Sequence, residues 1–427
     1  MIATALILLL VLVGLSLPVG AALGLLGFTL DGLFSMLPLT RGIGEIAWST
    51  NNEFLLVSIP LFVLLGEVLL RGGFAERMYG AMSLWLSWLP GGLMHANIGA
   101  SALFAATSGS SVATAATVGT VSIPQIQKNG YNEPLFLGSL AAGGTLGILI
   151  PPSINLVIYG VLTNSSVPKL YLAGILPGLL LAGLFMLTVW IACVIKPAWG
   201  GKKIQATWRE RFASLLHLLP PLGIFLLVVG SIYAGLATPT EAAALGVLGA
   251  LVLAACSRRL TLSMLRDAVE GAMKSTAMIM LIVLAAAFLN FVMAATGLTD
   301  ALTRSITGLG LSPGWMLLIV VLFYLVLGCF METLSMMIMT IPVIAPIMIG
   351  LGYDPVWLGI LIIVLVEAAL ITPPVGLNLF VVQSVRKSGS MTAVIVGSLP
   401  FVGAMAVLLL LLTWFPDLAL WLPRVFG

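Results

Sequence analysis

The chain of 427 residues is 60% hydrophobic and only 8% charged, with a mean hydropathy of +1.19. Soluble domains carry about 25% charged residues, so this composition excludes a sizeable soluble domain and predicts an all-α polytopic membrane protein. The apolar runs are long and continuous, which argues against a β-barrel, and the net charge of +3 does not indicate a partner such as a nucleic acid.

The first half of the chain, residues 1–195, has the pattern of membrane helices with interruptions. It begins MIATALILLLVLVGLSLPVG without the basic residues of a secretory signal, so we expect a retained membrane helix. The elements that we expect, in order, are spans at 3–25 and 53–70, a re-entrant hairpin at about 92–127, a broken span at about 134–164 and a span at 169–195. The segment at 74–90 is either an arm helix along the membrane, with Trp85 and Trp88 in the interfacial belt, or an ordinary connecting helix.

The tip of the first predicted hairpin is the run TSGSSVAT at 107–114. Its small residues allow a tight turn, and its hydroxyl and carbonyl oxygens are ligands that suit a hard monovalent cation such as sodium. Small residues also let helices pack closely without any further role, so this run alone leaves both interpretations open.

A basic linker at 196–213 separates the two halves and orients the chain. Its cations are Lys196, Lys202, Lys203, Arg209 and Arg211. By the positive-inside rule the linker lies in the cytoplasm, and tracing the spans from it puts the N-terminus inside and the C-terminus outside.

The second half, residues 214–427, shows the same order of elements. We expect spans at about 214–236, 240–256 and 275–295, a second arm or connecting segment at 298–311, a hairpin at about 312–350, a broken span at about 355–385 and a last span at about 391–414. Traced from the linker, these segments run opposite to those of the first half. The sequence therefore predicts two inverted repeats.

Each half contains a double proline inside an apolar helix. Pro151-Pro152 corresponds to Pro373-Pro374, since 151 and 373 differ by 222. Consecutive prolines remove two backbone donors and clash with the preceding turn, so each helix must break there. A break within lipid is tolerated only where protein, water or an ion satisfies the freed polar groups, and paired breaks are typical of the binding site of a secondary transporter.

Two carboxylates lie close to these features. Glu332 is at the second predicted hairpin tip, where a charge should face a cavity or a partner; it either binds a cation or proton or caps the helix that follows. Glu367 precedes Pro373 in the second broken span. It is either functional or a structural carboxylate hydrogen-bonded to backbone that the break frees.

The run ATPTEAAALG at 237–246 is typical of a helix start. Thr238 or Thr240 would cap the helix, and Pro239 suits its first turn. Glu241 faces the positive end of the helix dipole. We interpret this run as structural.

Cysteine and histidine give little support to other chemistries. The cysteines lie far apart in apolar segments, as expected of small core residues: Cys193, Cys256 and Cys329. His95 is the one candidate base for the alternative of an intramembrane hydrolase, whose nucleophile would be Ser108, Ser110 or Ser111. No Lys or Arg occurs at either hairpin tip or double proline, so an anionic substrate would be met by helix N-termini, hydroxyls and sodium.

Together these motifs resemble the large membrane subunit of TRAP (tripartite ATP-independent periplasmic) transporters, the DctM-like M subunit family. The matching stretches are SGSSVATAA at 108–116, AAGGTLGILIPPS at 141–153, ATPTEAAALG at 237–246, GCFMETLSM at 328–336 and LITPPVGLNLF at 370–380. They lie in both halves, so the resemblance covers essentially the whole chain. It implies a carrier, not an enzyme, in the bacterial inner membrane. In such an elevator-type carrier, two hairpins and two broken helices form a transport domain that slides against a scaffold.

The resemblance also implies the ligands of the site. One sodium ion would be bound by Ser110, Ser111, Gly144, Gly147 and Pro151, with Asn155. The other would be bound by Glu332, Thr333, Thr372, Val375 and Gly376, with Asn378, several of them through backbone carbonyls. The substrate would contact Ser108, Gly109, Ser153, Asn155, Ser335 and Asn378. The two asparagines do not align under the repeat, so the two sites are not expected to be simple copies.

The implied function is sodium-coupled uptake of an organic acid, such as a C4-dicarboxylate or sialic acid, with sodium as the coupling ion and no cofactor. The implied partners are a small membrane subunit (Q-type) on a separate polypeptide and a periplasmic substrate-binding protein. A dicarboxylate or citrate symporter of similar fold that acts without a binding protein is the alternative. A channel fits less well, because inverted broken-helix hairpins favour alternating access over a continuous pore.

Overall fold

The computed structural model describes residues 1–427 except 16, 203–205, 309 and 330, and leaves undescribed the side chains of residues 13, 106–108, 306 and 307 within helices. The described chain is helical throughout, with one isolated β-bridge between Tyr131 and Gly200. It includes seven helices long and apolar enough to cross a bilayer, or eight spans if one bent pair is counted as a span. The predicted all-α polytopic membrane protein is confirmed.

The helices up to the linker are α1 (Ile2–Gly14), α2 (Val19–Phe34), η1 (Leu39–Gly42), α3 (Ile43–Asn51), η2 (Phe54–Val57), α4 (Ser58–Arg71), α5 (Phe74–Leu86), α6 (Leu93–Ser108), α7 (Ser111–Ser122), α8 (Gln125–Asn129), α9 (Glu133–Leu149), α10 (Ile154–Thr163) and α11 (Val167–Ile195). The linker contains η3 (Pro197–Trp199) and the start of α12 (Trp208–Leu215).

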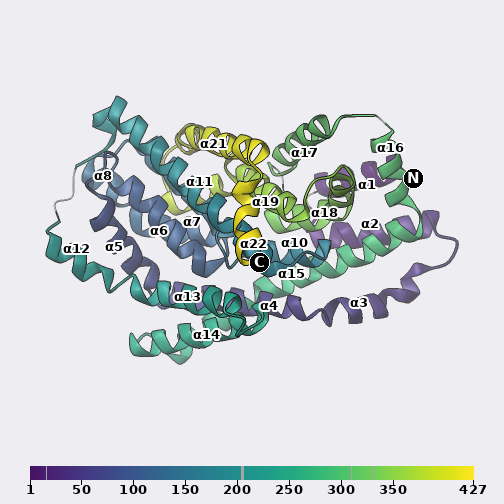
Figure 1. Cartoon of the computed structure of the whole chain (residues 1–427), viewed down its shortest axis with the longest axis horizontal. Coiled ribbons are helices and arrows are strands. Elements are labelled where there is room, and N and C mark those ends of the chain that lie inside the picture. Colours follow the sequence, from purple (N-terminus) through teal and green to yellow (C-terminus); the bar gives the residue numbers. More distant parts are fainter. Residues whose placement is uncertain (16, 203–205, 309, 330) are drawn as a thin grey trace.

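The helices that follow are α13 (Leu219–Tyr233), α14 (Pro239–Cys256), α15 (Leu262–Ala295), α16 (Leu298–Thr307), α17 (Pro313–Leu327), α18 (Thr333–Gly350), α19 (Pro355–Ile371), α20 (Leu377–Arg386), α21 (Met391–Trp414) and α22 (Asp417–Phe426). Figure 1 shows α12 at one end of the long axis and the N-terminus near the other, with the C-terminus close to the middle.

The starts of corresponding helices keep the spacing of the sequence repeat. The second arm of each hairpin begins at Ser111 or Thr333, and each broken span begins at Glu133 or Pro355; both pairs differ by 222. The orientation of the two halves across a bilayer stays a prediction.

Helices of each half of the chain pack against helices of the other half, an arrangement that we call the exchange of elements. α2 packs along α15, and α4 packs on α14 and α15 (Figure 1). At the other pair of contacts, α10 packs on α18 and α20 packs on α7, so the helix that follows each double proline lies against the hairpin of the other half. The site between the hairpins is therefore built from both halves at once.

The predicted single span at 3–25 is wrong. The structure has two helices there, α1 and α2, with Pro18 at the N-cap of α2. Proline has no N–H to donate and its ring clashes with a preceding helical turn, so α2 starts afresh after it. Sequence periodicity also missed α3, which has no buried residue, and the C-terminal α22.

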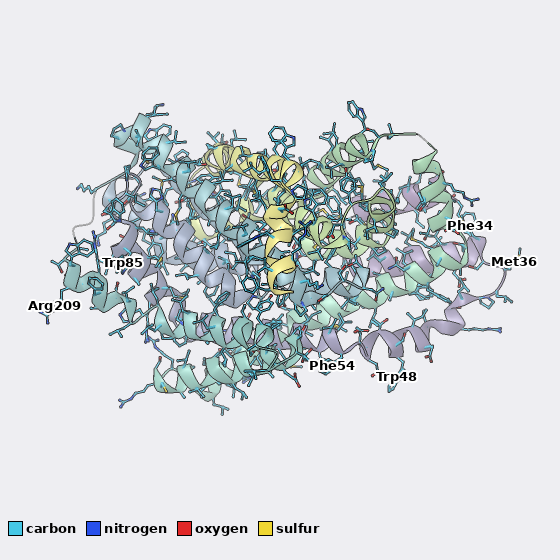
Figure 2. All side chains as sticks on the ribbon, viewed as in Figure 1. Phe34, Met36, Trp48, Phe54, Trp85 and Arg209 are labelled. Carbon is cyan, nitrogen blue, oxygen red and sulfur yellow. The ribbon has the colours of Figure 1, made fainter. Side chains whose placement is uncertain are left out.

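The segment predicted as an arm or connecting helix at 74–90 forms α5, which packs on α6 and buries Phe74, Met78 and Tyr79. Trp88 is exposed, but Trp85 donates its indole N–H to the Arg211 carbonyl at 3.0 Å. Figure 2 shows Trp85 and Arg209 at one end of the molecule and Met36 at the other. Cys193 and Cys329 are buried as expected, but Cys256 is exposed, since it ends α14 at the surface.

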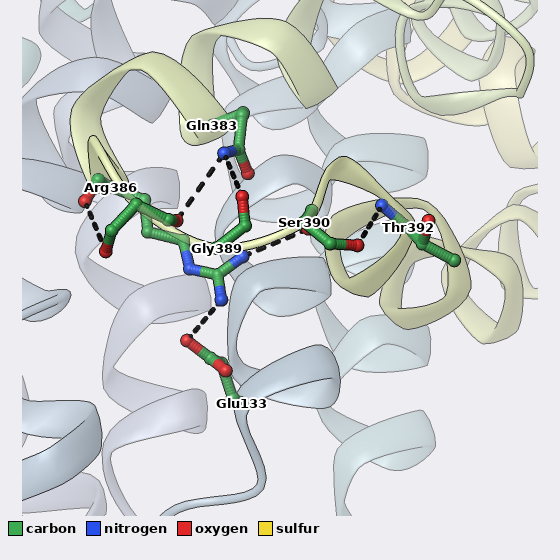
Figure 3. A network of polar contacts seen from close by, with 7 residues as sticks. Glu133, Gln383, Arg386, Gly389, Ser390 and Thr392 are labelled. Carbon is green, nitrogen blue, oxygen red and sulfur yellow. Dashed lines mark hydrogen bonds and ion pairs between the residues drawn. The ribbon is translucent and has the colours of Figure 1, made fainter.

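An ion pair fastens the end of α20 to the start of α9. Arg386 Nη2 lies 2.6 Å from Glu133 Oε1, and Nη1 donates to the Ser390 carbonyl at 3.1 Å (Figure 3). The side chain of Arg386 is only 8% exposed and that of Glu133 is 41% exposed. This ion pair joins the second half of the chain to the first, away from both double prolines in the sequence.

Candidate functional site

Both double prolines break their helices as predicted. α9 ends at Leu149 and α10 begins at Ile154, with a bend of 44° between them. In the second half α19 ends at Ile371 and α20 begins at Leu377. Ser153 is buried and caps α10 by accepting from Leu156 N–H at 3.4 Å, so one freed donor is satisfied by a side chain.

The first hairpin tip is a tight turn between α6 and α7. Gly109 has φ of 60°, a conformation that glycine adopts without the strain a side chain would add. Ser110 then caps α7 by accepting from Ala113 N–H at 3.3 Å. The side chain of Ser108, predicted to bind substrate, lies outside the described residues.

The first tip lies directly against α9. A Cβ added at Gly147 would lie 2.8 Å from the carbonyl of Ser110, and one at Gly144 would lie 3.1 Å from the carbonyl of Ser111. The structure thus brings Ser110, Ser111, Gly144 and Gly147 together. Pro151 is buried and follows α9 directly, and it does not line the cavity described below.

Asn378 lies with the first set of residues, although the family resemblance placed it with the second. Its Nδ2 donates to the Ala141 carbonyl at 3.3 Å, and a Cβ at Gly144 would lie 3.0 Å from the same atom. The reason is the exchange of elements, which lays the start of α20 against the first half. Asn378 Oδ1 and Asn155 Nδ2 are buried and have no hydrogen-bond partner in the described chain.

At the second tip, Glu332 caps α18. Its Oε2 accepts from Ser335 N–H at 3.1 Å and from Ser335 Oγ at 3.3 Å, and its Oε1 accepts from Thr333 Oγ1 at 3.1 Å. Of the interpretations open for Glu332, capping is therefore the one with a described contact. Ser335 serves this cap and does not line the cavity.

The second break lies against the start of the second tip. The carbonyl oxygens of Thr372 and Pro373 approach Cys329 Sγ at 4.0 and 3.7 Å, and the Thr372 hydroxyl donates to the Ala368 carbonyl. Val375 and Gly376 follow in the same turn but, like Thr372, stand outside the lining of the cavity.

One cavity of about 370 Å³ joins the two hairpin tips. Its lining includes predicted site residues from both halves: Gly109, Ser110, Ser111, Asn155, Glu332 and Thr333. No lysine or arginine lines it in the described part of the chain. Four helices present their first turns to it, since Ser111, Ile154, Thr333 and Leu377 begin α7, α10, α18 and α20. Helix N-termini carry partial positive charge and favour anions.

Two further polar residues of the cavity come from outside the hairpins and broken helices. Glu67 on α4 and Ser275 on α15 line its opposite wall, and Glu67 is ion-paired with Arg71 at 3.0 Å. A carboxylate within the apolar run around 59–70 is a signal that could have identified Glu67. Ser275 carries no such signal.

Glu367 does not bind backbone freed by the break, as one interpretation had it. It is fully buried, and Ser111 Oγ lies 2.8 Å from its Oε1 and 3.0 Å from its Oε2. The partner is a hydroxyl at the first hairpin tip, which belongs to the other half of the chain. This contact could not be found from sequence spacing.

His95, the one candidate base for a hydrolase, lies too far from the serines of the first hairpin tip to act on them. His95 lies near the start of α6 and its Nε2 is 2.8 Å from the Pro90 carbonyl oxygen, whereas Ser110 follows the end of that helix. A helix rises 1.5 Å per residue, so His95 lies about 20 Å from the hairpin tip.

An all-helical membrane protein whose two broken helices and two hairpin tips contribute to one cavity, with polar groups from both halves in a mainly apolar lining, has the architecture of a secondary transporter. The family model of the tripartite ATP-independent periplasmic transporter, DctM component, matches residues 6–418, and the chain belongs to this family. It is a transporter permease and not an enzyme.

Named relatives cover most of the chain. It is 36% identical over 413 residues to the C4-dicarboxylate TRAP transporter large permease protein DctM of Pseudomonas aeruginosa, covering 96% of this chain and 94% of that one. It is 32% identical over 410 residues to the isethionate TRAP transporter permease protein DctMQ of Oleidesulfovibrio alaskensis, covering 93% of this chain and 62% of that one. The crystal structure of the Alcanivorax borkumensis YdaH transporter has a TM-score of 0.60 at 17% identity, covering 95% of this chain and 98% of that one, which shows the fold alone.

Proposed function

We propose that this chain is the large permease of a sodium-coupled uptake system for an organic acid in the bacterial inner membrane. The observation that carries the proposal is the cavity in which four helix N-termini meet without any lysine or arginine in the described lining. The N-termini favour a carboxylate or another organic anion. The substrates named for the relatives, a C4-dicarboxylate and isethionate, are both of this kind.

Sodium fits the residues at the first tip. Backbone carbonyls of Ser110 and Ser111 lie close to the glycine face of α9, and hydroxyl oxygens are adjacent. Such oxygen donors suit a hard cation, and the thiolate and imidazole ligands that zinc prefers are missing from this set. A sodium ion here would also supply positive charge beside an anionic substrate.

The mechanism that we propose is alternating access of the elevator type. Hairpins α6–α7 and α17–α18, with the broken spans α9–α10 and α19–α20, form the transport domain. Helices α2, α4, α14 and α15 form the scaffold, and α4 and α15 supply the opposite wall of the cavity. Movement of the first group past the second would carry the cavity from one side of the membrane to the other.

The proposed partners are a small membrane subunit and a periplasmic binding protein. The relative whose name is DctMQ is longer than this chain, as expected if the small subunit is fused there and separate here. The N-terminus is proposed to lie inside and the C-terminus in the periplasm.

The test is uptake of radiolabelled organic acids into proteoliposomes that contain this chain and its small subunit. We expect uptake only with both an inward sodium gradient and the binding protein. Uptake by this chain alone would establish the symporter that needs no binding protein, and uptake unchanged by collapse of the sodium gradient would overturn the coupling.

A further inference from the structure

The carboxylate of Glu367 connects the second broken span with the first hairpin tip. Ser111 is the first residue of α7 and Glu367 lies in the last turns of α19, on opposite halves of the chain. Their contact is short, with Ser111 Oγ 2.8 and 3.0 Å from the two carboxylate oxygens. Ser111 is 2% exposed and Glu367 is 0% exposed, so water does not compete for it.

The charge of Glu367 has no cationic partner. Within the described residues, no Lys, Arg or His forms an ion pair with it. A buried carboxylate is costly unless it is paired and hydrogen-bonded, and one serine hydroxyl is too little compensation. Either a proton on the carboxyl group or a cation bound nearby would remove this cost.

The oxygen-rich first tip is where such a cation would bind. The hydroxyl proton of Ser111 is directed to Glu367, which leaves the lone pairs of Ser111 Oγ free to face another group. A hydroxyl that donates to a carboxylate is fixed in orientation and polarised, as with metal ligands whose outer-shell partners are carboxylates.

At the second tip, too, a hydroxyl donates to a carboxylate, but there the carboxylate comes from the same hairpin. Thr333 corresponds to Ser111 in the repeat, and its Oγ1 donates to Glu332 at 3.1 Å. Glu332 belongs to the same tip and caps its own helix. Glu367, by contrast, reaches the first tip from the other half.

We propose that Glu367 is a positioning residue that orients and polarises Ser111 as a cation ligand, so that the state of the second broken span sets sodium affinity at the first tip. The inference rests on the proposed sodium coupling and adds a residue that does not itself touch ion or substrate.

The test measures sodium binding separately from transport. The purified chain is melted in detergent at increasing NaCl, with choline chloride holding the ionic strength constant. In Glu367→Gln, which keeps the shape and loses the charge, we expect the sodium concentration for half-maximal stabilisation to rise about 10- to 100-fold. In proteoliposomes, the sodium concentration that gives half-maximal uptake should rise by a similar factor. The maximal uptake rate at saturating sodium should be largely retained.

Ser398→Ala is the matched control. Ser398 is a buried serine whose Oγ lies 2.8 Å from the Ile395 carbonyl of its own helix and 3.3 Å from the Ile371 carbonyl, so it contacts the end of α19 away from the first tip. It should melt at a lower temperature with unchanged sodium half-saturation. If Glu367→Gln does not purify as a monodisperse protein, Glu367→Asp withdraws the carboxylate by one methylene, and a smaller shift of the same sign is expected.

The outcomes separate the two proposals. A Glu367 variant that melts earlier but keeps wild-type sodium half-saturation would show a purely structural role and overturn this inference alone. A wild-type chain without sodium-dependent stabilisation or uptake would overturn the sodium coupling itself.

Discussion

Gly147 lies where the backbone of the first hairpin tip comes close to α9. The atoms that a Cβ would meet, at 2.8 Å, are backbone atoms of Ser110 and Ser111 that cannot rotate away. Only a shift of the whole tip would make room, and that shift would move the predicted sodium ligands.

We therefore expect Gly147→Ala to reduce sodium-dependent uptake at least about tenfold, with a stability loss of about 1–3 kcal/mol from overpacking. Initial uptake rates in proteoliposomes and the melting temperature in detergent measure the two effects. Gly183→Ala is the control, because Gly183 is a helical glycine on α11 with open space at its Cβ. Equal uptake by the two variants would mean that the close approach at Gly147 has no functional role.

Residues whose role depends on near neighbours were predictable, and those that depend on the other half were not. The sequence placed a cap at Thr238 or Thr240, and the structure selects Thr238, with Glu241 completing a capping box. Glu367 had no such local signal, because its partner Ser111 lies 256 residues away. The contact of Asn378 with α9 had no local signal for the same reason.

At the scale of single helices, the start of α14 tests how much a cap contributes. Thr238 Oγ1 accepts from Glu241 N–H at 3.3 Å, and Glu241 Oε2 accepts from Thr238 N–H at 2.8 Å. Thr238→Ala should lower the free energy of unfolding by about 1 kcal/mol, seen as a lower melting temperature. Thr413→Ala, which removes an exposed hydroxyl in the last turn of α21 that donates to its own helix, should not. Identical melting of the two variants would argue that the cap is dispensable.

The pairing of α20 with α9 makes a second prediction for elements. Because the Arg386 side chain is nearly buried and Glu133 is half-exposed, Arg386→Ala should cost about 1–3 kcal/mol, between the values for exposed and buried ion pairs. Thermal melting measures it, and Lys274→Ala, in an exposed pair with Glu270, should have almost no effect. An Arg386→Ala protein as stable as Lys274→Ala would show that the two halves are held without this pair.

At the scale of the whole molecule, the repeat was visible in the sequence as a recurring double proline and a shared order of elements. The equal spacing of helix starts, from Ser111 to Thr333 and from Glu133 to Pro355, follows from that punctuation. The exchange of elements was not visible, because α2 meets α15 and α20 meets α7 across more than half of the chain. Hydropathy locates most of the apolar segments, and packing between the halves decides which of them share a site.

The orientation of the chain in the membrane needs a direct test, because two helices, α1 and α2, replace the single span from which the side of the N-terminus was predicted. Met36 and Arg209 lie at opposite ends of the molecule, and both positions are exposed (Figure 2). In a Cys256→Ser background, which removes the exposed native thiol, a membrane-impermeant maleimide should label Met36→Cys in intact spheroplasts. It should label Arg209→Cys only after permeabilisation, since the basic linker remains inside. Labelling of Met36→Cys only after permeabilisation would place the α2–α3 turn in the cytoplasm and show that α1 and α2 do not act as one crossing.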